Sequence, residues 1–168
     1  EIDNGDKDPI RRLNLMGSDI LVRNGNWMIC GDVWIGNAGG YSGVSLLTDV
    51  TAFENESYVA VDRNRGRLFG YDDQGNLLFA FGGSGNVDGC FRTPSAIEHM
   101  DYDLLVLDAV DCSLTLFTPT EYGLLIYEAM DLFKAGDYAG SEAAWRKVIA
   151  LNGNYDLAYI GIGRALLR

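Results

Sequence analysis

The sequence Y-V-A-V-D at 58–62, with R-L-F-G-Y at 67–71, recurs as L-L-V-L-D at 104–108 with S-L-T-L-F at 113–117. Asp62 and Asp108 end the apolar runs and lie 46 residues apart; a leucine follows each at the sixth position and an aromatic residue at the ninth. Each unit predicts a short apolar strand, an acidic turn and an alternating strand. We expect both carboxylates to accept backbone N–H groups in these turns, with ligand binding as the alternative role.

A third strand is predicted at 77–81, after the acidic turn at 72–76, and a glycine-rich link follows it. Several short strands in each repeat of roughly 40–50 residues are typical of β-propeller blades. Residues 59–97 resemble an NHL repeat. The residues that match the pattern of that family are Asp62, Asn64, Arg67, Leu68, Phe69, Tyr71, Gly75, Phe81, Gly82, Gly89, Phe91, Pro94 and Ile97.

The resemblance weakens on both sides of this repeat. The next unit keeps Asp108, Leu114 and Phe117 but lacks the N-x-R triplet, and the segment 27–36 reads as further strands with a weak match. The resemblance implies mainly β structure over residues 1–120, as a partial β-propeller of two to three NHL-like blades. Since propellers close with roughly four to eight blades, we expect further blades to precede this segment in a longer chain. Self-association through the open propeller edge is the alternative.

Helical spacing replaces strand alternation from Tyr122 onward. Apolar residues recur at helical intervals over 122–135 and, after a G-D-Y turn, over 139–151. The N-G-N triplet at 152–154 favours a helix end, and a third helix is predicted to begin near Tyr155. The class predicted for the whole chain is therefore mainly β plus α.

The third helix repeats the first at a spacing of 34 residues, so that Ile126, Ala129 and Leu132 recur as Ile160, Gly163 and Leu166. This period, the G-D-Y turn and the paired helices resemble a tetratricopeptide (TPR) repeat. The resemblance implies an antiparallel helical segment over residues 121–168, of about one and a half repeats. It also implies close helix contacts at Ala129 and Gly163.

In TPR arrays the first helices of the repeats form a concave binding face. The residues at that repeat position are Ile126, Met130, Phe133, Lys134, Ile160, Arg164 and Arg168. Core packing is the competing role for the apolar members of this set. Because such repeats stack, we expect the array to continue beyond Arg168, with self-association of the unfinished repeat as the alternative.

The net charge of −11 excludes several partners. Residues 1–121 hold 8 basic and 19 acidic side chains, whereas residues 122–168 hold 5 of each. An acidic surface repels phosphate backbones, so we expect no nucleic-acid partner. No apolar run approaches the ~20 residues that a membrane helix needs, so we expect no membrane insertion by this segment.

Few residues suggest catalysis or metal binding. We expect His99, the sole histidine, in a surface turn between strands, and Cys30, Cys90 and Cys112 as small buried residues. The glycine string at 82–89 lacks the ending of a phosphate-binding loop, and the string at 36–43 lacks the strand–helix context of one, so both are expected to link blades. We therefore predict no catalytic residue, no metal site and no cofactor.

These features favour a non-catalytic protein–protein interaction or scaffold module with an unidentified protein or peptide partner. The alternatives are binding of a small molecule or sugar on the propeller face, or a lactonase-like, metal-dependent hydrolase. For the hydrolase, Asp62, Asn64, Asp108 and Asp111 are candidates by residue type alone. The combination of NHL-like and TPR-like repeats resembles bacterial extracytoplasmic or envelope-associated proteins of unknown function.

Overall fold

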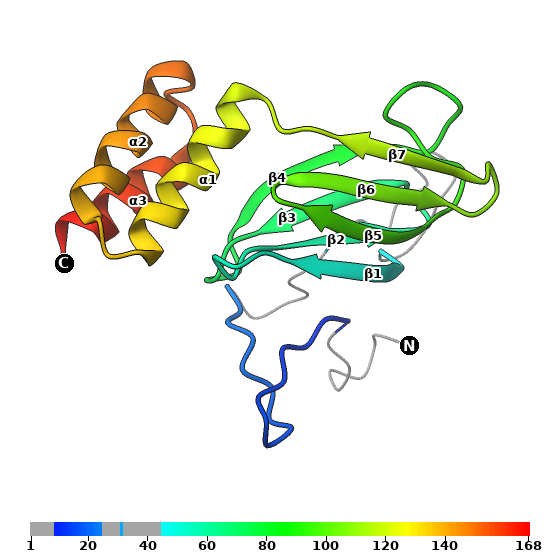
Figure 1. The fold of residues 1–168 in the computed structure, drawn as a ribbon, viewed down its shortest axis with the longest axis horizontal. Coiled ribbons are helices and arrows are strands. Elements are labelled where there is room, and N and C mark those ends of the chain that lie inside the picture. The colour runs from blue at the N-terminus through cyan, green and yellow to red at the C-terminus, as the bar shows by residue number, and fades with distance from the viewer. Residues whose placement is uncertain (1–8, 25–30, 32–44) are drawn as a thin grey trace. The chain divides into compact units, whose positions relative to one another are not determined.

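The computed structural model describes residues 9–24, 31 and 45–168 (Figure 1). Its contacts divide the chain into two compact units. Unit 1 comprises Glu1–Met100 and Leu104–Leu116, and unit 2 comprises Asp101–Asp103 and Phe117–Arg168. The sequence predicts mainly β structure together with α-helices. The structure confirms that the chain is mixed α/β, with two antiparallel sheets and three helices among the described residues.

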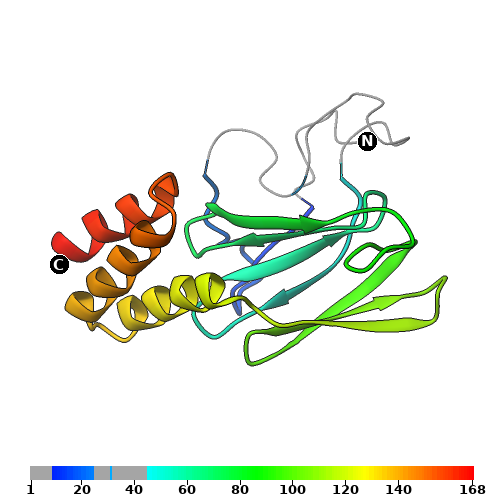
Figure 2. The same cartoon turned by 90° about the horizontal axis from the view of Figure 1, so that it is seen from above.

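The strands form two sheets in which sequence neighbours pair (Figures 1 and 2). The first sheet has the order β1 (Leu47–Ala52), β2 (Tyr58–Asp62), β3 (Arg67–Tyr71) and β4 (Leu77–Gly82). The second has the order β5 (Pro94–Met100), β6 (Asp103–Asp108) and β7 (Ser113–Phe117). Adding 46 to the residue numbers of β3 gives the bounds of β7. The same addition brings the bounds of β1 and β2 to within one or two residues of those of β5 and β6. The same shift moves β4 into the first helix, so the second sheet has one described strand fewer.

Strands β1 and β5 were not identified from sequence patterns. The expectation that His99 lies in a surface turn is wrong, because His99 lies in β5. These two strands lie side by side where the sheets meet. Asp49 of β1 accepts the backbone N–H of Ile97 in β5 at 2.9 Å. Polar side chains at this contact interrupt the apolar alternation that identifies the other strands. The further strands predicted at 27–36 lie, apart from Gly31, outside the described residues.

Asp62 and Asp108 fix equivalent turns, as the sequence predicts. The Asp62 carboxylate accepts the backbone N–H groups of Leu46 (3.3 Å), Asn64 (2.9 Å) and Arg65 (3.3 Å). The Asp108 carboxylate accepts those of Arg92 (2.7 Å), Thr93 (2.9 Å), Val110 (2.9 Å) and Asp111 (3.1 Å). Three of these donors recur at a spacing of 46 residues. The sequence repeat is therefore also a repeat of hydrogen bonds.

The core of unit 1 forms around β2, which is buried along its whole length. A strand buried on both faces needs an uninterrupted apolar run, which Y-V-A-V supplies. Tyr58 stacks on Tyr71 with ring centroids 5.3 Å apart, and Phe69 completes the cluster. Ile10 and Leu21 pack against it from the N-terminal segment.

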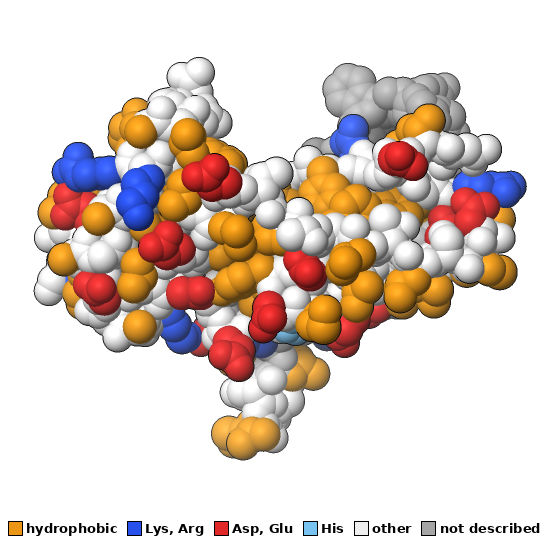
Figure 3. Space-filling model, turned by 45° about the horizontal axis from the view of Figure 1, so that its top comes forward, with side chains coloured by type: hydrophobic (Ala, Val, Ile, Leu, Met, Phe, Trp, Pro, Cys, Tyr) orange, Lys and Arg blue, Asp and Glu red, His pale blue; other side chains and the backbone are white. Residues whose placement is uncertain are grey.

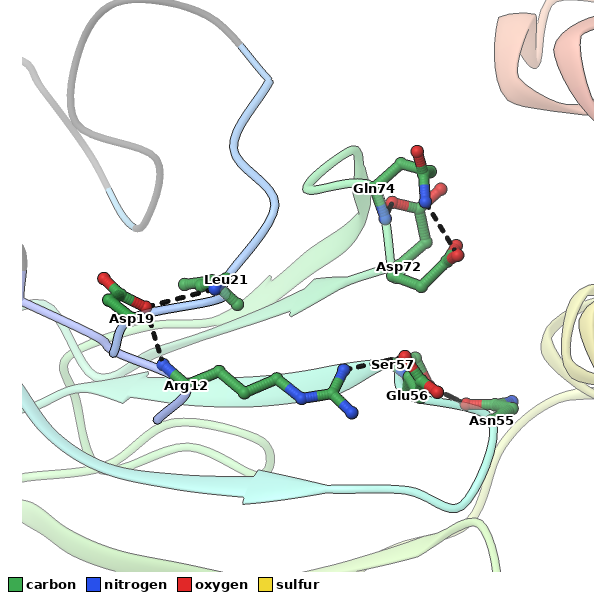
Figure 4. A network of polar contacts seen from close by, with 9 residues as sticks. Arg12, Asp19, Leu21, Asn55, Glu56, Ser57, Asp72 and Gln74 are labelled. Carbon is green, nitrogen blue, oxygen red and sulfur yellow. Dashed lines mark hydrogen bonds and ion pairs between the residues drawn. The ribbon is translucent and has the colours of Figure 1, made fainter. Parts of the chain in front are cut away.

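The N-terminal segment is held by polar contacts (Figure 4). Arg12 pairs with Glu56 at 2.7 Å, and Asp19 accepts the backbone N–H groups of Arg12 and Leu21 at 3.1 Å each. The pKa of Asp19 is lowered first by its hydrogen bond from the Arg23 side chain and then by the Leu21 N–H. Ile10 and Arg12 thus make defined contacts within unit 1, and residues 1–8 lie outside the described residues.

One turn residue of the repeat carries backbone strain. Gly66 has φ +64°, and its equivalent 46 residues later is Cys112 with φ +49°. The left-handed conformation is costly for a residue with a Cβ.

Replacing Cys112 by glycine should therefore raise the free energy of unfolding by about 0.5–1 kcal/mol, since the strain removed exceeds the entropy that glycine adds to the unfolded chain. Denaturant unfolding measures this. Cys112→Ala retains the strain and should give no gain; an equal gain in both variants would contradict the assignment.

Unit 2 contains α1 (Glu121–Lys134), α2 (Tyr138–Leu151) and α3 (Asp156–Leu166), close to the predicted ranges. Thr120 caps α1 by accepting the N–H of Gly123 at 3.2 Å, and Asp137 caps α2 through Gly140 at 2.9 Å. Helix α2 packs against both α1 and α3. None of the helices within the described ranges is long and apolar enough to cross a membrane.

The close contact between α2 and α3 occurs at Gly161. A Cβ added there would lie 2.4 Å from the ring of Trp145, which is buried. The expectation that Gly163 provides this contact is wrong, because a Cβ added at Gly163 would meet nothing within 4 Å. Ala129, the other predicted contact residue, is fully buried, and its carbonyl accepts the Ser141 hydroxyl at 2.7 Å.

Candidate functional site

The seven residues predicted to form a binding face differ in accessibility. Ile126 is buried, with 5% of its surface exposed. Met130, Phe133 and Arg164 are half-buried, whereas Lys134, Ile160 and Arg168 are exposed. A buried side chain offers nothing to a partner, so Ile126 belongs to the core. The remaining six residues lie on α1, on α3 and at the end of the chain.

Phe133 and Arg164 join α1 to α3. The guanidinium carbon of Arg164 lies 4.8 Å from the centroid of the Phe133 ring, which is the geometry of a cation–π contact. The Tyr138 ring meets Phe133 edge-on, with centroids 5.3 Å apart. Two predicted site residues from different helices are thus held together, with a guanidinium beside an aromatic ring. Arginine and aromatic side chains are enriched in protein interfaces.

Corresponding positions of the two related helices are not equally covered. Ile126 of α1 is 5% exposed, but its counterpart Ile160 in α3 is 50% exposed. Leu132 is half-buried, whereas its counterpart Leu166 is 64% exposed. Within the described part of unit 2, α3 therefore presents apolar positions that are covered on α1.

A tyrosine outside the helices covers part of α1. Tyr102, which belongs to unit 2, stacks on Tyr127 with ring centroids 4.1 Å apart, and its hydroxyl donates a hydrogen bond to Asp131. Burial raises the pKa of Tyr127 well above the usual range of a phenol. Sequence reasoning missed this contact, because a single tyrosine in the short turn between β5 and β6 carries no periodic signal.

A polar cluster joins β1 to β5 in unit 1. The hydroxyl of Thr51 donates to Glu98 at 2.9 Å and lies 2.6 Å from Nδ1 of His99. The Phe53 ring meets the His99 ring edge-on at 4.8 Å. The pKa of Glu98 is lowered, first by the His99 backbone N–H and then by the Thr51 hydroxyl.

The geometry of this cluster is that of a strand junction. A nucleophile–base–acid relay places the nucleophile and the orienting acid on different ring nitrogens of the histidine. Here Glu98 and Thr51 both contact Nδ1 of His99, at 3.1 and 2.6 Å. Thr51 is also 95% buried. The cluster therefore bridges two strands and does not form such a relay.

The carboxylates considered as metal ligands have other partners. Asp62 and Asp108 are buried in their turns, and Asp111 pairs with Arg92 at 3.1 Å. Asp72, in the acidic turn at 72–76, accepts the backbone N–H of Gln74 at 2.9 Å (Figure 4). It also accepts the backbone N–H of Asn76 at 2.7 Å. Within residues 9–24, 31 and 45–168, no group of three or more His, Cys, Asp or Glu side chains is arranged to hold a metal.

The expectation that the cysteines are buried is wrong for the two that the structure describes. Cys112 is exposed because it occupies the turn between β6 and β7, and Cys90 is half-buried; neither forms a disulfide in the described structure. Cys30 and the glycine string 36–43 lie outside the described residues. On the face drawn in Figure 3, acidic and hydrophobic side chains intermingle, and Lys and Arg form small groups without a continuous basic patch.

No family model matches the chain, and no curated protein matches it significantly.

Proposed function

We propose that this chain is a non-catalytic protein–protein interaction module whose binding face lies on α3 and the adjoining part of α1. The face consists of Met130, Phe133, Lys134, Ile160, Arg164 and Arg168. The observation that carries the proposal is the contact of Arg164 of α3 with the Phe133 ring of α1, at 4.8 Å, one helical turn from the exposed Ile160. Arginine and aromatic side chains held together in this way are enriched in protein interfaces.

We propose further that the two sheets are NHL-like blades and that the helices are the beginning of a TPR-like array. The 46-residue repeat of strands, turns and carboxylate hydrogen bonds supports the first assignment. The 34-residue repeat of α1 in α3, with α2 packed against both, supports the second. Both repeat types present surfaces to other molecules without needing a catalytic centre.

The chemistry of the face restricts its partner. Lys134, Arg164 and Arg168 carry three positive charges next to apolar side chains, and residues 122–168 have a balanced charge in an otherwise acidic chain. A protein or peptide segment with apolar anchors and flanking acidic groups complements such a face. The acidic remainder of the chain repels that partner elsewhere and so favours binding at the helices.

Ile160→Asp tests this proposal. Because Ile160 is half-exposed, the change should leave the helices folded while placing a buried charge in the complex. Affinity capture from extract of the source organism, with identification by mass spectrometry, should recover a specific protein with the wild type. The variant should retain at least about tenfold less of it, corresponding to about 1.4 kcal/mol.

Leu151→Asp is the matched control, because Leu151 is 60% exposed at the end of α2 and outside the face. It should capture the same protein as the wild type. Equal loss in both variants, or no loss with Ile160→Asp, would place the binding surface elsewhere. Circular dichroism of all three proteins confirms that the helices are intact.

A further inference from the structure

The second sheet ends at an exposed strand edge. In the first sheet, β3 carries β4 on its outer side, but no strand within the described residues pairs with the outer side of the equivalent strand β7. The segment that corresponds to β4 in the 46-residue repeat lies in α1 instead. Unpaired N–H and C=O groups along a sheet edge can hydrogen-bond a further strand.

Strand β7 lacks the features that usually protect such an edge. Natural edge strands carry lysines, prolines, bulges or inward-pointing charges that prevent pairing. Residues 113–117 read S-L-T-L-F without a charge or a proline, and the next charged residue along the chain after this strand is Glu121. Leu114 and Leu116 are 64% and 52% exposed, and strand alternation places both on one face.

The sequence of β7 is complementary to itself in the antiparallel direction. If Thr115 pairs with Thr115 of another copy, Leu114 of each strand lies opposite Leu116 of the other. Threonine pairs and apolar pairs are favourable across antiparallel strands, and the four leucines then gather on one face. In a chain of net charge −11, this uncharged segment is also a place where a second copy meets little repulsion.

We propose that β7 pairs with β7 of a second copy of this chain, antiparallel, about a two-fold axis at Thr115. The two three-stranded sheets then form one continuous six-stranded sheet. A pair of five-residue strands buries less than the roughly 1,200 Å² of a standard interface, so this dimer is weak and depends on concentration.

The other open edge, at β4, does not give the same closed assembly. The side chain of Asn24 bonds that of Asn76, and Gly75 lies against the backbone of residues 22–24, so the N-terminal segment borders the start of β4. If β4 of one copy paired with β7 of another, the first copy would keep its β7 edge open and the second would keep its β4 edge open. Such a contact adds copies without closure, which sedimentation distinguishes from a dimer.

A cysteine placed on the axis tests the register. Thr115→Cys should form a disulfide with the same residue of the second copy under air oxidation, because paired residues have Cα atoms about 4.5–5.5 Å apart. Ser113→Cys is the matched control. It lies opposite Phe117, so the two engineered cysteines are separated by about 13 Å along the strands, too far for a disulfide. Peptide mapping must assign the bond to position 115, since Cys112 is also exposed.

Sedimentation velocity from micromolar to millimolar concentration tests the dimer itself. The wild type should shift from monomer to dimer, and Leu114→Lys should remain monomeric at every concentration. Val110→Lys, which adds the same charge at a 51% exposed position in the preceding turn, should dimerise like the wild type. A monomer throughout, a disulfide at Ser113→Cys equal to that at Thr115→Cys, or open-ended growth would overturn the proposal.

Discussion

Replacing Asp108 by alanine should lower the free energy of unfolding by about 3–5 kcal/mol. The carboxylate is 1% exposed and accepts four backbone N–H groups, two from the segment before β5 and two from the turn after β6. Each buried donor left without an acceptor costs about 1–3 kcal/mol, reduced where water enters. Chemical denaturation followed by tryptophan and far-ultraviolet signals measures the loss.

Asp111→Ala is the control for this prediction. Asp111 lies three residues further on and pairs with Arg92, but both side chains are exposed. Its loss should change the free energy of unfolding by no more than about 0.5 kcal/mol. Comparable effects of the two substitutions would show that the repeated carboxylate is not what holds the turn.

The contribution of Asp108 should also depend on pH in a defined direction. Burial opposes its ionisation, but the N–H groups, that of Thr93 foremost, outweigh burial and lower the pKa below the ordinary 3.8. A lowered pKa means that the unfolded state binds more protons, so this stabilisation exists above about pH 4 and disappears as pH falls through the native pKa. The stability difference between wild type and Asp108→Asn should therefore shrink on acidification. A constant or growing difference would contradict this assignment.

Two glycines of α3 should respond oppositely to the same substitution. Gly161→Ala should destabilise unit 2 by about 1–3 kcal/mol, because its Cβ would lie 2.4 Å from the buried Trp145 ring. Gly163→Ala should stabilise it by about 0.5–1 kcal/mol, since a Cβ there meets no atom and alanine favours the helix.

Thermal unfolding followed by the helical circular dichroism signal compares these variants, because all three described helices belong to unit 2. The two substitutions share the same gain in helix propensity, so their difference isolates the contact with Trp145. Destabilisation by both to the same extent would show that α3 packs on α2 at a different position.

The predictable part of the fold is the part with periodic apolar residues. The runs at 58–62, 67–71 and 104–108 identify their strands, and the spacing of apolar residues identifies all three helices within two residues of their ends. The turn-forming role of Asp62 and Asp108 can also be predicted from the sequence, because an acidic residue that ends an apolar strand accepts backbone N–H groups in the following turn.

The unpredicted part depends on contacts between distant segments. Strands β1 and β5 meet through Asp49, Thr51 and His99, and polar pairs of this kind leave no alternation in either sequence. For the site, the 34-residue spacing identifies which residues share a repeat position, but it does not distinguish Ile126 from Ile160. Only the packing of the helices shows that the first is buried and the second half-exposed.

Hydrogen–deuterium exchange of the full chain, with and without the captured partner, tests the proposed binding face most directly. We expect partner binding to slow amide exchange in α3 and in the C-terminal half of α1, around Met130, Phe133 and Ile160, while exchange in β1–β7 stays unchanged. Protection confined to the strands, with α1 and α3 exchanging as in the free chain, would contradict an interaction module that binds through its helices.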